Sequence, residues 1–257
     1  MIASIIGVLK LLRPFLMFVA LAVSCFFALI NLPLRFIGIN LDYFIISTWS
    51  KITLWIYGIK IKKLGTTTKE SSIITTNHIS YWDILTISAS YKTFFVSRAD
   101  VKNWPLLGLG ARAVRTVFIE REKAMSAMDV LNNKAVKLLN GNNSLVMFAE
   151  GTSSAKPCLP FKNGAFHLSI KTGRPIKPIA IYYDRMDYIP WIDDDFFVPH
   201  LLKMAKAPRI TCYIYEMPHM YPKDFKSMVE MKQACQKMVQ EKIDHIKKDI
   251  LGEKDNA

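Results

Sequence analysis

Residues 73–83 read Ile-Ile-Thr-Thr-Asn-His-Ile-Ser-Tyr-Trp-Asp, and they decide how the rest of the chain is interpreted. The first four residues are a short β-branched run, which is typical of a strand. Five positions apart on one helix, His78 and Asp83 would point away from each other, so they can meet only if the chain turns between them. We predict that His78 lies in a loop and that a helix N-capped by Ser80 begins at Tyr81, with Asp83 in its first turn.

A histidine and a carboxylate that meet in this way suit acyl transfer to an alcohol. The imidazole can remove the hydroxyl proton, and the carboxylate fixes the tautomer and stabilises the imidazolium. The chain contains no Gly-x-Ser-x-Gly sequence, so a serine nucleophile lacks its usual signal. The structural alternative is a capping box, Ser80-x-x-Asp83, in which Asp83 serves the helix N-terminus and His78 is an ordinary loop histidine.

Short apolar runs alternate with helical patterns from residue 73 onward, which predicts an α/β domain. The strand candidates are residues 73–76, 94–97, 117–119, 145–148, 176–183 and 210–215. Apolar residues recurring at steps of three and four predict one helix over 123–140 and another over about 224–250.

The N-terminus holds the longest apolar segment. Pro14 to Leu34 carries no charge and is long enough to cross a bilayer core of about 30 Å. Cations flank it on both sides, so charge asymmetry does not orient a span. Pro33 and the amphipathic stretch Leu41 to Tyr57 favour a helical hairpin dipping into one leaflet, and a single span is the alternative.

The polar segment Gly65 to Ser72 is the one linker that the sequence suggests. We therefore expect a membrane anchor over residues 1–64 and a catalytic domain over 65–257. Lys and Arg number 34 against 21 Asp and Glu, a formal net charge of +13, while 51% of the residues are hydrophobic. An apolar and basic chain suits an anionic membrane surface better than nucleic acid, for which no recognition motif is present.

Four further blocks follow Asp83. They are VFIER at 117–121, FAEGTSS at 148–154, FKNGA at 161–165 and IKPIAI at 176–181. In this order and spacing, the blocks and Asn77–Asp83 resemble the glycerolipid acyltransferases of the Asn-His-x4-Asp type, above all the lysophosphatidic acid acyltransferases. The resemblance covers about residues 73–181 and the hydrophobic N-terminus. It implies an α/β fold with a mixed sheet flanked by helices and an N-terminal hydrophobic helical membrane anchor.

The resemblance also implies an O-acyltransferase that needs no cofactor and no metal. Acyl-CoA or acyl-carrier protein would donate a fatty acyl group to the free hydroxyl of a lysolipid. His78 would be the general base, Asp83 its orienting partner, and Arg121 a contact to the acceptor's phosphate, which Arg can grip bidentately. The residues that match the family's acceptor-binding block are Glu150, Gly151 and Thr152.

One departure bears on the acceptor. The family's third block usually reads Phe-Pro-Glu-Gly-Thr-Arg-Ser, whereas this chain has Ala149 for the proline and Ser153 for the arginine. Loss of that cation leaves Lys156 or Lys162 to supply a charge for a phosphate. We expect 1-acyl-glycerol-3-phosphate as the acceptor, giving phosphatidic acid. Lyso-ornithine lipid or another lysophospholipid is the alternative, because relatives that acylate phosphate-free lyso-ornithine lipids also resemble this chain.

The expected location is a membrane, with the catalytic domain on its cytoplasmic face, which is the inner membrane in a bacterium. The expected partners are membrane lipids, the lysolipid and the acyl donor, and not nucleic acid. A non-catalytic membrane-binding protein with the same fold is the competing class. It gives no reason for both His78 and Asp83 to be present.

Overall fold

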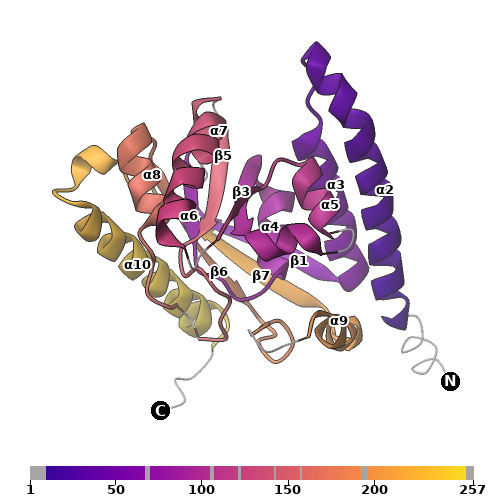
Figure 1. Cartoon of the computed structure of the whole chain (residues 1–257). Coiled ribbons are helices and arrows are strands. Elements are labelled where there is room, and N and C mark those ends of the chain that lie inside the picture. The colour runs from indigo at the N-terminus through magenta and orange to yellow at the C-terminus, as the bar shows by residue number, and fades with distance from the viewer. Residues whose placement is uncertain are drawn as a thin grey trace.

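The computed structural model describes residues 10–66, 70–104, 107–120, 123–141, 143–156, 158–192 and 196–252. These residues build a seven-stranded sheet with helices on both sides (Figure 1). The strands are β1 (Ile59–Gly65), β2 (Ile73–Thr76), β3 (Thr93–Arg98), β4 (Val117–Ile119), β5 (Ser144–Phe148), β6 (Ile176–Tyr183) and β7 (Ile210–Glu216). Six of them lie where the sequence predicts strands, to within one residue at each end; β1 is the one it does not predict.

The sheet is mixed. Its strand order is β1-β7-β6-β2-β5-β3-β4, and neighbouring strands are parallel except β6 and β7. Five strands, β2 to β6, therefore end at one common edge, where β1 and β7 begin. Every residue of β2 and β6 is buried, as expected for central strands covered on both faces. The loop that carries His78 leaves the centre of the sheet at this common edge.

Helices cover the two faces of the sheet in separate groups (Figure 1). One group holds α6 (Ala124–Val130), α7 (Val136–Asn140), α8 (Gly164–Thr172) and α10 (Met228–His245). The other holds α2 (Arg13–Leu34), α3 (Asp42–Tyr57), α4 (Trp82–Ser90) and α5 (Leu107–Ala113), with α9 (Phe197–Lys206) beside the start of α2. The short helical segments are η1 (Arg35–Ile37), η2 (Ala99–Asn103), η3 (Leu131–Ala135), η4 (Pro222–Asp224) and η5 (Ile246–Ile250).

Both helices predicted beyond the His block are present. The first runs through α6, η3 and α7 and contains a π-helical turn, η3, at its centre. The second, α10 continued by η5, begins at residue 228 rather than about 224. Ser227 sets this start, because its hydroxyl accepts a hydrogen bond from the Glu230 N–H while the Glu230 carboxylate accepts one from the Lys226 N–H. This resembles a capping box, except that the carboxylate reaches the N–H of the residue before the N-cap.

The N-terminal apolar segments form the expected hairpin, in which α2 packs along α3 (Figure 1). Its turn is held by Asp42, whose side chain is only 2% exposed. The Asp42 carboxylate accepts hydrogen bonds from the Asn31 amide at 2.7 Å and the Arg115 guanidinium at 2.8 Å, and it pairs with Arg35. A buried carboxylate is stable here because cations and an amide surround it.

The outer side of the hairpin is apolar and exposed. Large exposed side chains on α2, η1 and α3 include Phe15, Phe26, Phe27, Phe36, Phe44 and Trp55. One described helix, Arg13–Ile37, is long and apolar enough to cross a membrane, and 28% of its most apolar window is buried. A continuous exposed apolar face of this kind suits association with a membrane.

The boundary expected after residue 64 is wrong by one strand, because it falls inside β1. All seven residues of β1 pair with β7, so residues 59–64 belong to the sheet. Ile-Lys-Ile-Lys-Lys-Leu-Gly alternates apolar and basic residues at its start, which is the pattern of a half-exposed edge strand. The expected linker contains residues 67–69, which lie outside the described residues.

Candidate active site

The loop after β2 begins with Asn77, whose side chain forms hydrogen bonds like those between the backbones of neighbouring strands. The Asn77 side-chain N–H donates to the Ile181 carbonyl, and its side-chain oxygen accepts from the Ile181 N–H, both at 2.9 Å. Asn77 therefore continues the pairing between β2 and β6 with its side chain while its backbone leaves the sheet. This fixes the point at which the next residue, His78, enters the loop.

His78 and Asp83 meet, as the turn between them requires. Nδ1 of His78 lies 2.8 Å from Oδ2 of Asp83. The Asp83 side chain is fully buried, whereas that of His78 is 12% exposed. A carboxylate can only accept, so the hydrogen of the neutral imidazole lies on Nδ1 and the Nε2 lone pair is free to accept a proton.

Asp83 also holds the backbone of the loop. Its Oδ2 accepts hydrogen bonds from the N–H groups of Ile79 at 2.6 Å and Ser80 at 2.9 Å. The helix-capping interpretation and the catalytic one therefore describe the same carboxylate. The predicted cap by Ser80 is wrong, since α4 begins at Trp82 and the buried Ser80 hydroxyl has no hydrogen-bond partner among the described residues.

Two neighbours that the sequence analysis missed complete this arrangement. The Tyr183 hydroxyl, at the end of β6, donates to Oδ1 of Asp83 at 2.7 Å. Burial, with the nearby Asp83 charge, raises the pKa of Tyr183, so the hydroxyl keeps the proton that it donates. The ring of Phe148 stacks on the imidazole of His78 with centroids 4.0 Å apart and 18° between planes. The position of each residue at the end of a predicted strand could have indicated both. Phe148 ends β5 and Tyr183 ends β6, and both strands end at the same edge of the sheet as β2.

The third sequence block lies against the His78 loop. The Ala149 N–H donates to the Thr76 carbonyl at 3.1 Å, and the Ser154 N–H donates to the His78 carbonyl at 2.9 Å. The intervening Glu150, Gly151 and Thr152 therefore form a turn beside the imidazole. The structure thus brings the expected acceptor-binding residues next to the His78–Asp83 pair.

Glu150 is almost fully buried in this turn. Burial raises the pKa of Glu150 to about 8, backbone N–H groups of Leu159 and His78 act in the opposite direction, and the Asp83 charge adds to the rise. Glu150 is therefore mostly protonated at neutral pH.

Gly151 is required where it stands. Its φ is +75°, and a Cβ at this position would lie 2.8 Å from Nζ of Lys162. The exposed Lys162 side chain thus lies directly over the Gly151 turn, whereas Lys156 is exposed two residues beyond Ser154. Lys156 contacts the third block through its backbone N–H, which donates to the Ser154 hydroxyl at 3.0 Å, whereas Lys162 places its side chain against the Gly151 turn.

Arg121 lies outside the described residues. The preceding strand in the sequence, β4, ends at Ile119 at the same edge of the sheet as β2. The role expected for Arg121 stays a prediction.

The chain belongs to the acyltransferase family. Residues 58–182 match the family model described as Acyltransferase. The chain is 30% identical over 178 residues to the 1-acyl-sn-glycerol-3-phosphate acyltransferase of Haemophilus influenzae, an alignment that covers 67% of this chain and 74% of that protein.

Relatives with a different named acceptor are also similar. The lyso-ornithine lipid O-acyltransferase of Brucella abortus is 30% identical over 170 residues, covering 59% of this chain and 63% of that protein. That of Rhizobium meliloti is 29% identical over 177 residues, covering 62% of this chain and 60% of that protein. The matched segment thus spans about three fifths of the length of these two relatives.

A solved structure shares the fold. The 1-acyl-sn-glycerophosphate (LPA) acyltransferase PlsC of Thermotoga maritima matches with a TM-score of 0.70 and 20% sequence identity, covering 95% of this chain and 97% of that one. The match confirms the expected α/β architecture with helices on both sides of the sheet.

Proposed function

We propose that this protein transfers a fatty acyl group from a thioester to the free hydroxyl of a lysolipid. The observation that carries the proposal is the 2.8 Å contact between His78 and Asp83, with Nε2 free and the carboxylate fixed by three further hydrogen bonds. A histidine oriented in this way is a general base. The named activities of the relatives support the same reaction.

The reaction follows from this geometry. Nε2 of His78 accepts the proton of the lysolipid hydroxyl as the oxygen attacks the thioester carbonyl, and the buried Asp83 carboxylate stabilises the imidazolium. The tetrahedral intermediate collapses by breaking the carbon–sulfur bond, and the imidazolium returns the proton to the leaving thiolate. The ester and the free thiol are the products. Acyl-CoA and acyl-carrier protein both present such a thioester.

The acceptor proposed is 1-acyl-glycerol-3-phosphate. Lys162 over the Gly151 turn offers a cation where the sequence lacks the arginine of the third block. With Glu150 protonated, no second carboxylate repels a phosphate from this turn. Lyso-ornithine lipid is the second candidate, because Ser153 itself brings no cation and several relatives bear that name.

The proposed location is the cytoplasmic face of a membrane. The exposed apolar face of the α2–α3 hairpin associates the chain with the bilayer. Acyl-CoA and acyl-carrier protein are cytoplasmic donors, so the site at the edge of the sheet must open to that side.

The test is an assay of the full chain in vesicles against both lysolipids, with acyl-CoA and acyl-carrier protein as alternative donors. His78→Ala should lower turnover by about 10²- to 10⁴-fold, because it removes the proton acceptor and little packing. His245→Ala, a half-exposed histidine on α10, is the matched control and should keep normal turnover. Near-normal turnover of the His78 variant would refute the mechanism.

The same assay separates the two acceptors. Ser153→Arg should preserve or raise activity on 1-acyl-glycerol-3-phosphate, and Lys162→Gln should raise its Michaelis constant by about tenfold or more, since a charge-assisted hydrogen bond contributes about 1.5 to 3 kcal/mol. Neither change should impair use of lyso-ornithine lipid. A wild type active only on lyso-ornithine lipid would refute the first choice of acceptor while leaving the acyl transfer intact.

A further inference from the structure

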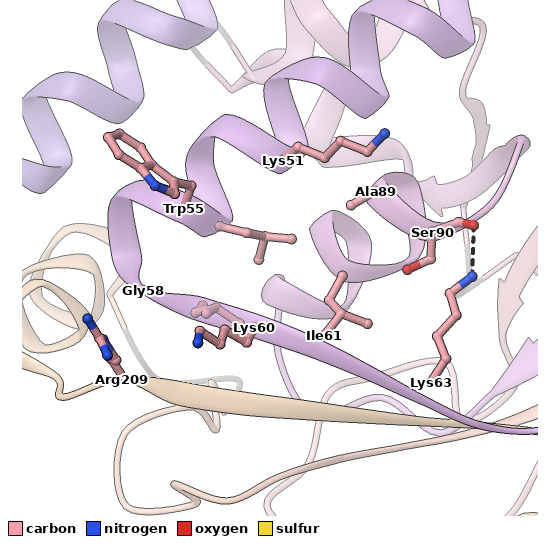
Figure 2. A pocket seen from close by; sticks show the side chains of 11 residues that line it. Lys51, Trp55, Gly58, Lys60, Ile61, Lys63, Ala89, Ser90 and Arg209 are labelled. Atoms are coloured by element: carbon pink, nitrogen blue, oxygen red, sulfur yellow. Dashed lines mark hydrogen bonds between the residues drawn. The ribbon is translucent and has the colours of Figure 1, made fainter.

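A cavity of about 620 Å³ lies away from His78, between the second half of α3, the strand β1 and the end of α4 (Figure 2). Its floor is apolar, with Leu54, Ile59 and Ile61. Four cations, Lys51, Lys60, Lys63 and Arg209, line it, and no carboxylate does. Its chemistry therefore selects an anion.

Three of the four cations are available to a ligand. Lys63 is already engaged, since its ammonium donates to the Ser90 carbonyl at 3.1 Å and lies 4.2 Å from the centre of the Tyr91 ring. Lys51, Lys60 and Arg209 are exposed, and within the described residues none of them has an ion-pair partner. Figure 2 shows Lys51 on one side of the cavity and Lys60 and Arg209 on the other.

The cavity opens beside the apolar face of the hairpin. Trp55, which lines it, is 81% exposed. Ile52 and Phe44 are exposed on the same helix, α3, and continue the apolar surface of α2. Tryptophan and basic residues together at the border of an apolar surface are typical of the membrane–water interface. An anion held among these cations would therefore lie at the depth of lipid phosphates.

The cavity is separate from the candidate active site. Its strand, β1, is three positions from β2 in the sheet, which at about 4.8 Å per strand is roughly 14 Å. A headgroup bound between α3 and β1 therefore does not occupy the place of an acceptor at His78. The phosphates of a soluble acyl-CoA would satisfy the same cations, but they give no reason for the exposed Trp55 and its apolar surroundings.

We infer that this cavity binds the phosphate of an anionic membrane phospholipid, whose acyl chains lie along Trp55 and the apolar face of the hairpin. This goes beyond the proposed acyl transfer: the bound lipid is a component of the membrane surface and is not consumed. It would hold the start of β1 and the end of α3 at the headgroup layer, with the catalytic edge of the sheet in a constant orientation.

The experiment uses the full chain in phosphatidylcholine vesicles that contain phosphatidylglycerol or phosphatidylcholine with brominated acyl chains. Bromine quenches a nearby tryptophan, and Trp55→Phe identifies the contribution of Trp55. Wild type should show stronger quenching by brominated phosphatidylglycerol than by brominated phosphatidylcholine, and Trp55→Phe should lose the difference.

Two triple variants of equal charge test the site. Lys51→Gln/Lys60→Gln/Arg209→Gln should need about 100-fold more phosphatidylglycerol for the same quenching, about fivefold per cation. The control replaces three lysines elsewhere on the chain, Lys62→Gln/Lys171→Gln/Lys237→Gln, and should stay close to wild type. Arg209→Gln alone should show a shift of about fivefold, which keeps the test valid if the triple variant does not fold.

Equal losses in the two triple variants would overturn the proposal, because they would show diffuse attraction to the surface. Quenching that does not distinguish the two brominated lipids would overturn it as well. If added CoA removes the preference for phosphatidylglycerol in wild type, the cavity belongs to the acyl donor instead. The readout involves no acyl transfer, so its failure is distinct from a failure of the proposed function.

Discussion

Asp83 combines two tasks that are usually separate: it caps the turn before α4 and orients the histidine beside it. Its Oδ2 takes the two backbone N–H groups and Nδ1 of His78, while Oδ1 is held by Tyr183. Together these hydrogen bonds fix the position of the carboxylate. A substitution at Asp83 would therefore change stability and catalysis together. Tyr183, which contacts the other carboxylate oxygen, is the better position for a test.

Tyr183→Phe removes one hydrogen bond from Asp83 and leaves the three on Oδ2. Because the lost bond was made to a charged group, the free energy of unfolding should fall by about 1.5 to 3 kcal/mol. Turnover should fall less than in His78→Ala, since the imidazole keeps its carboxylate. Tyr213→Phe, on the neighbouring strand β7, is the control. Urea unfolding and steady-state kinetics on the same samples would measure both effects, and an unchanged Tyr183 variant would contradict the assigned contact.

Glu150 makes stability depend on pH. Below its ordinary pKa of 4.5 the side chain is protonated in both the folded and the unfolded chain. Between pH 4.5 and about 8 only the folded chain retains the proton, so the free energy of unfolding falls as pH rises and levels off above about 8. A rise of the pKa from 4.5 to about 8 corresponds to at most about 5 kcal/mol.

Glu150→Gln should remove this dependence. Its gain in melting temperature over wild type should be small at pH 5 and should grow up to about pH 8. Glu241→Gln, at an exposed position on α10, should show no such trend. If the melting temperatures of wild type and Glu150→Gln instead differ by the same amount at every pH from 5 to 8, Glu150 is ionised in the folded chain.

The α2–α3 hairpin is fastened at its turn by charge as well as by apolar packing. Asp42→Asn would leave Arg35 and Arg115 beside a neutral amide, with side chains 21% and 38% exposed. Since both cations reach solvent, the expected loss of stability is about 1 to 3 kcal/mol, less than for a fully buried pair. Asp100→Asn, which breaks an exposed pair with Arg98, should stay within about 0.5 kcal/mol of wild type. Equal losses of stability in Asp42→Asn and Asp100→Asn, measured by thermal unfolding, would contradict the role of Asp42.

The elements that sequence patterns predicted well are those whose burial is regular. β2 and β6 are buried along their whole length because helices cover both faces. β1 was not predicted from the sequence, because an edge strand with three lysines resembles the basic flank of a membrane anchor. Only its pairing with β7, about 150 residues later, identifies it as part of the sheet. Such a contact depends on the whole fold, and the alternation at the start of the strand does not by itself distinguish a sheet edge from the basic flank of an anchor.

In the candidate site, too, contacts between residues close in sequence were predicted and contacts between distant residues were not. His78 and Asp83 are close in sequence, so local turn geometry was enough to predict that they meet. Tyr183 comes from a strand 100 positions further on, and its place beside Asp83 follows only from the strand order. Asn77 was recognised as part of the sequence block, but its pairing with Ile181 requires β6 as the neighbour of β2.

At the scale of the whole molecule, the hairpin is part of the fold as well as the proposed membrane contact. Tyr57, at the end of α3, is fully buried and its ring lies 4.6 Å from that of Trp82, which immediately precedes Asp83. Removing the hairpin would expose Trp82 at the start of α4. The proposed membrane-facing hairpin therefore supports the helix that carries Asp83.

Deleting residues 1–58 should accordingly destroy cooperative unfolding in detergent, not merely vesicle binding. The control keeps the packing and changes only the outer surface: Phe26→Ser/Phe27→Ser/Phe44→Ser should weaken vesicle flotation and leave the melting temperature near that of wild type. Exposed apolar positions contribute little to folding, which gives this contrast its physical basis. A well-folded deletion variant would show that the anchor and the sheet are independent.

The outermost strand of the sheet has one more consequence. β1 ends the strand order, so one of its sides has no strand beside it within the described residues. A bare strand edge can recruit a strand from a neighbouring molecule, and the risk grows for proteins crowded onto a two-dimensional surface. Lys60, Lys62 and Lys63 repel a second copy of the same strand. The lysines of β1 therefore guard against edge-to-edge aggregation.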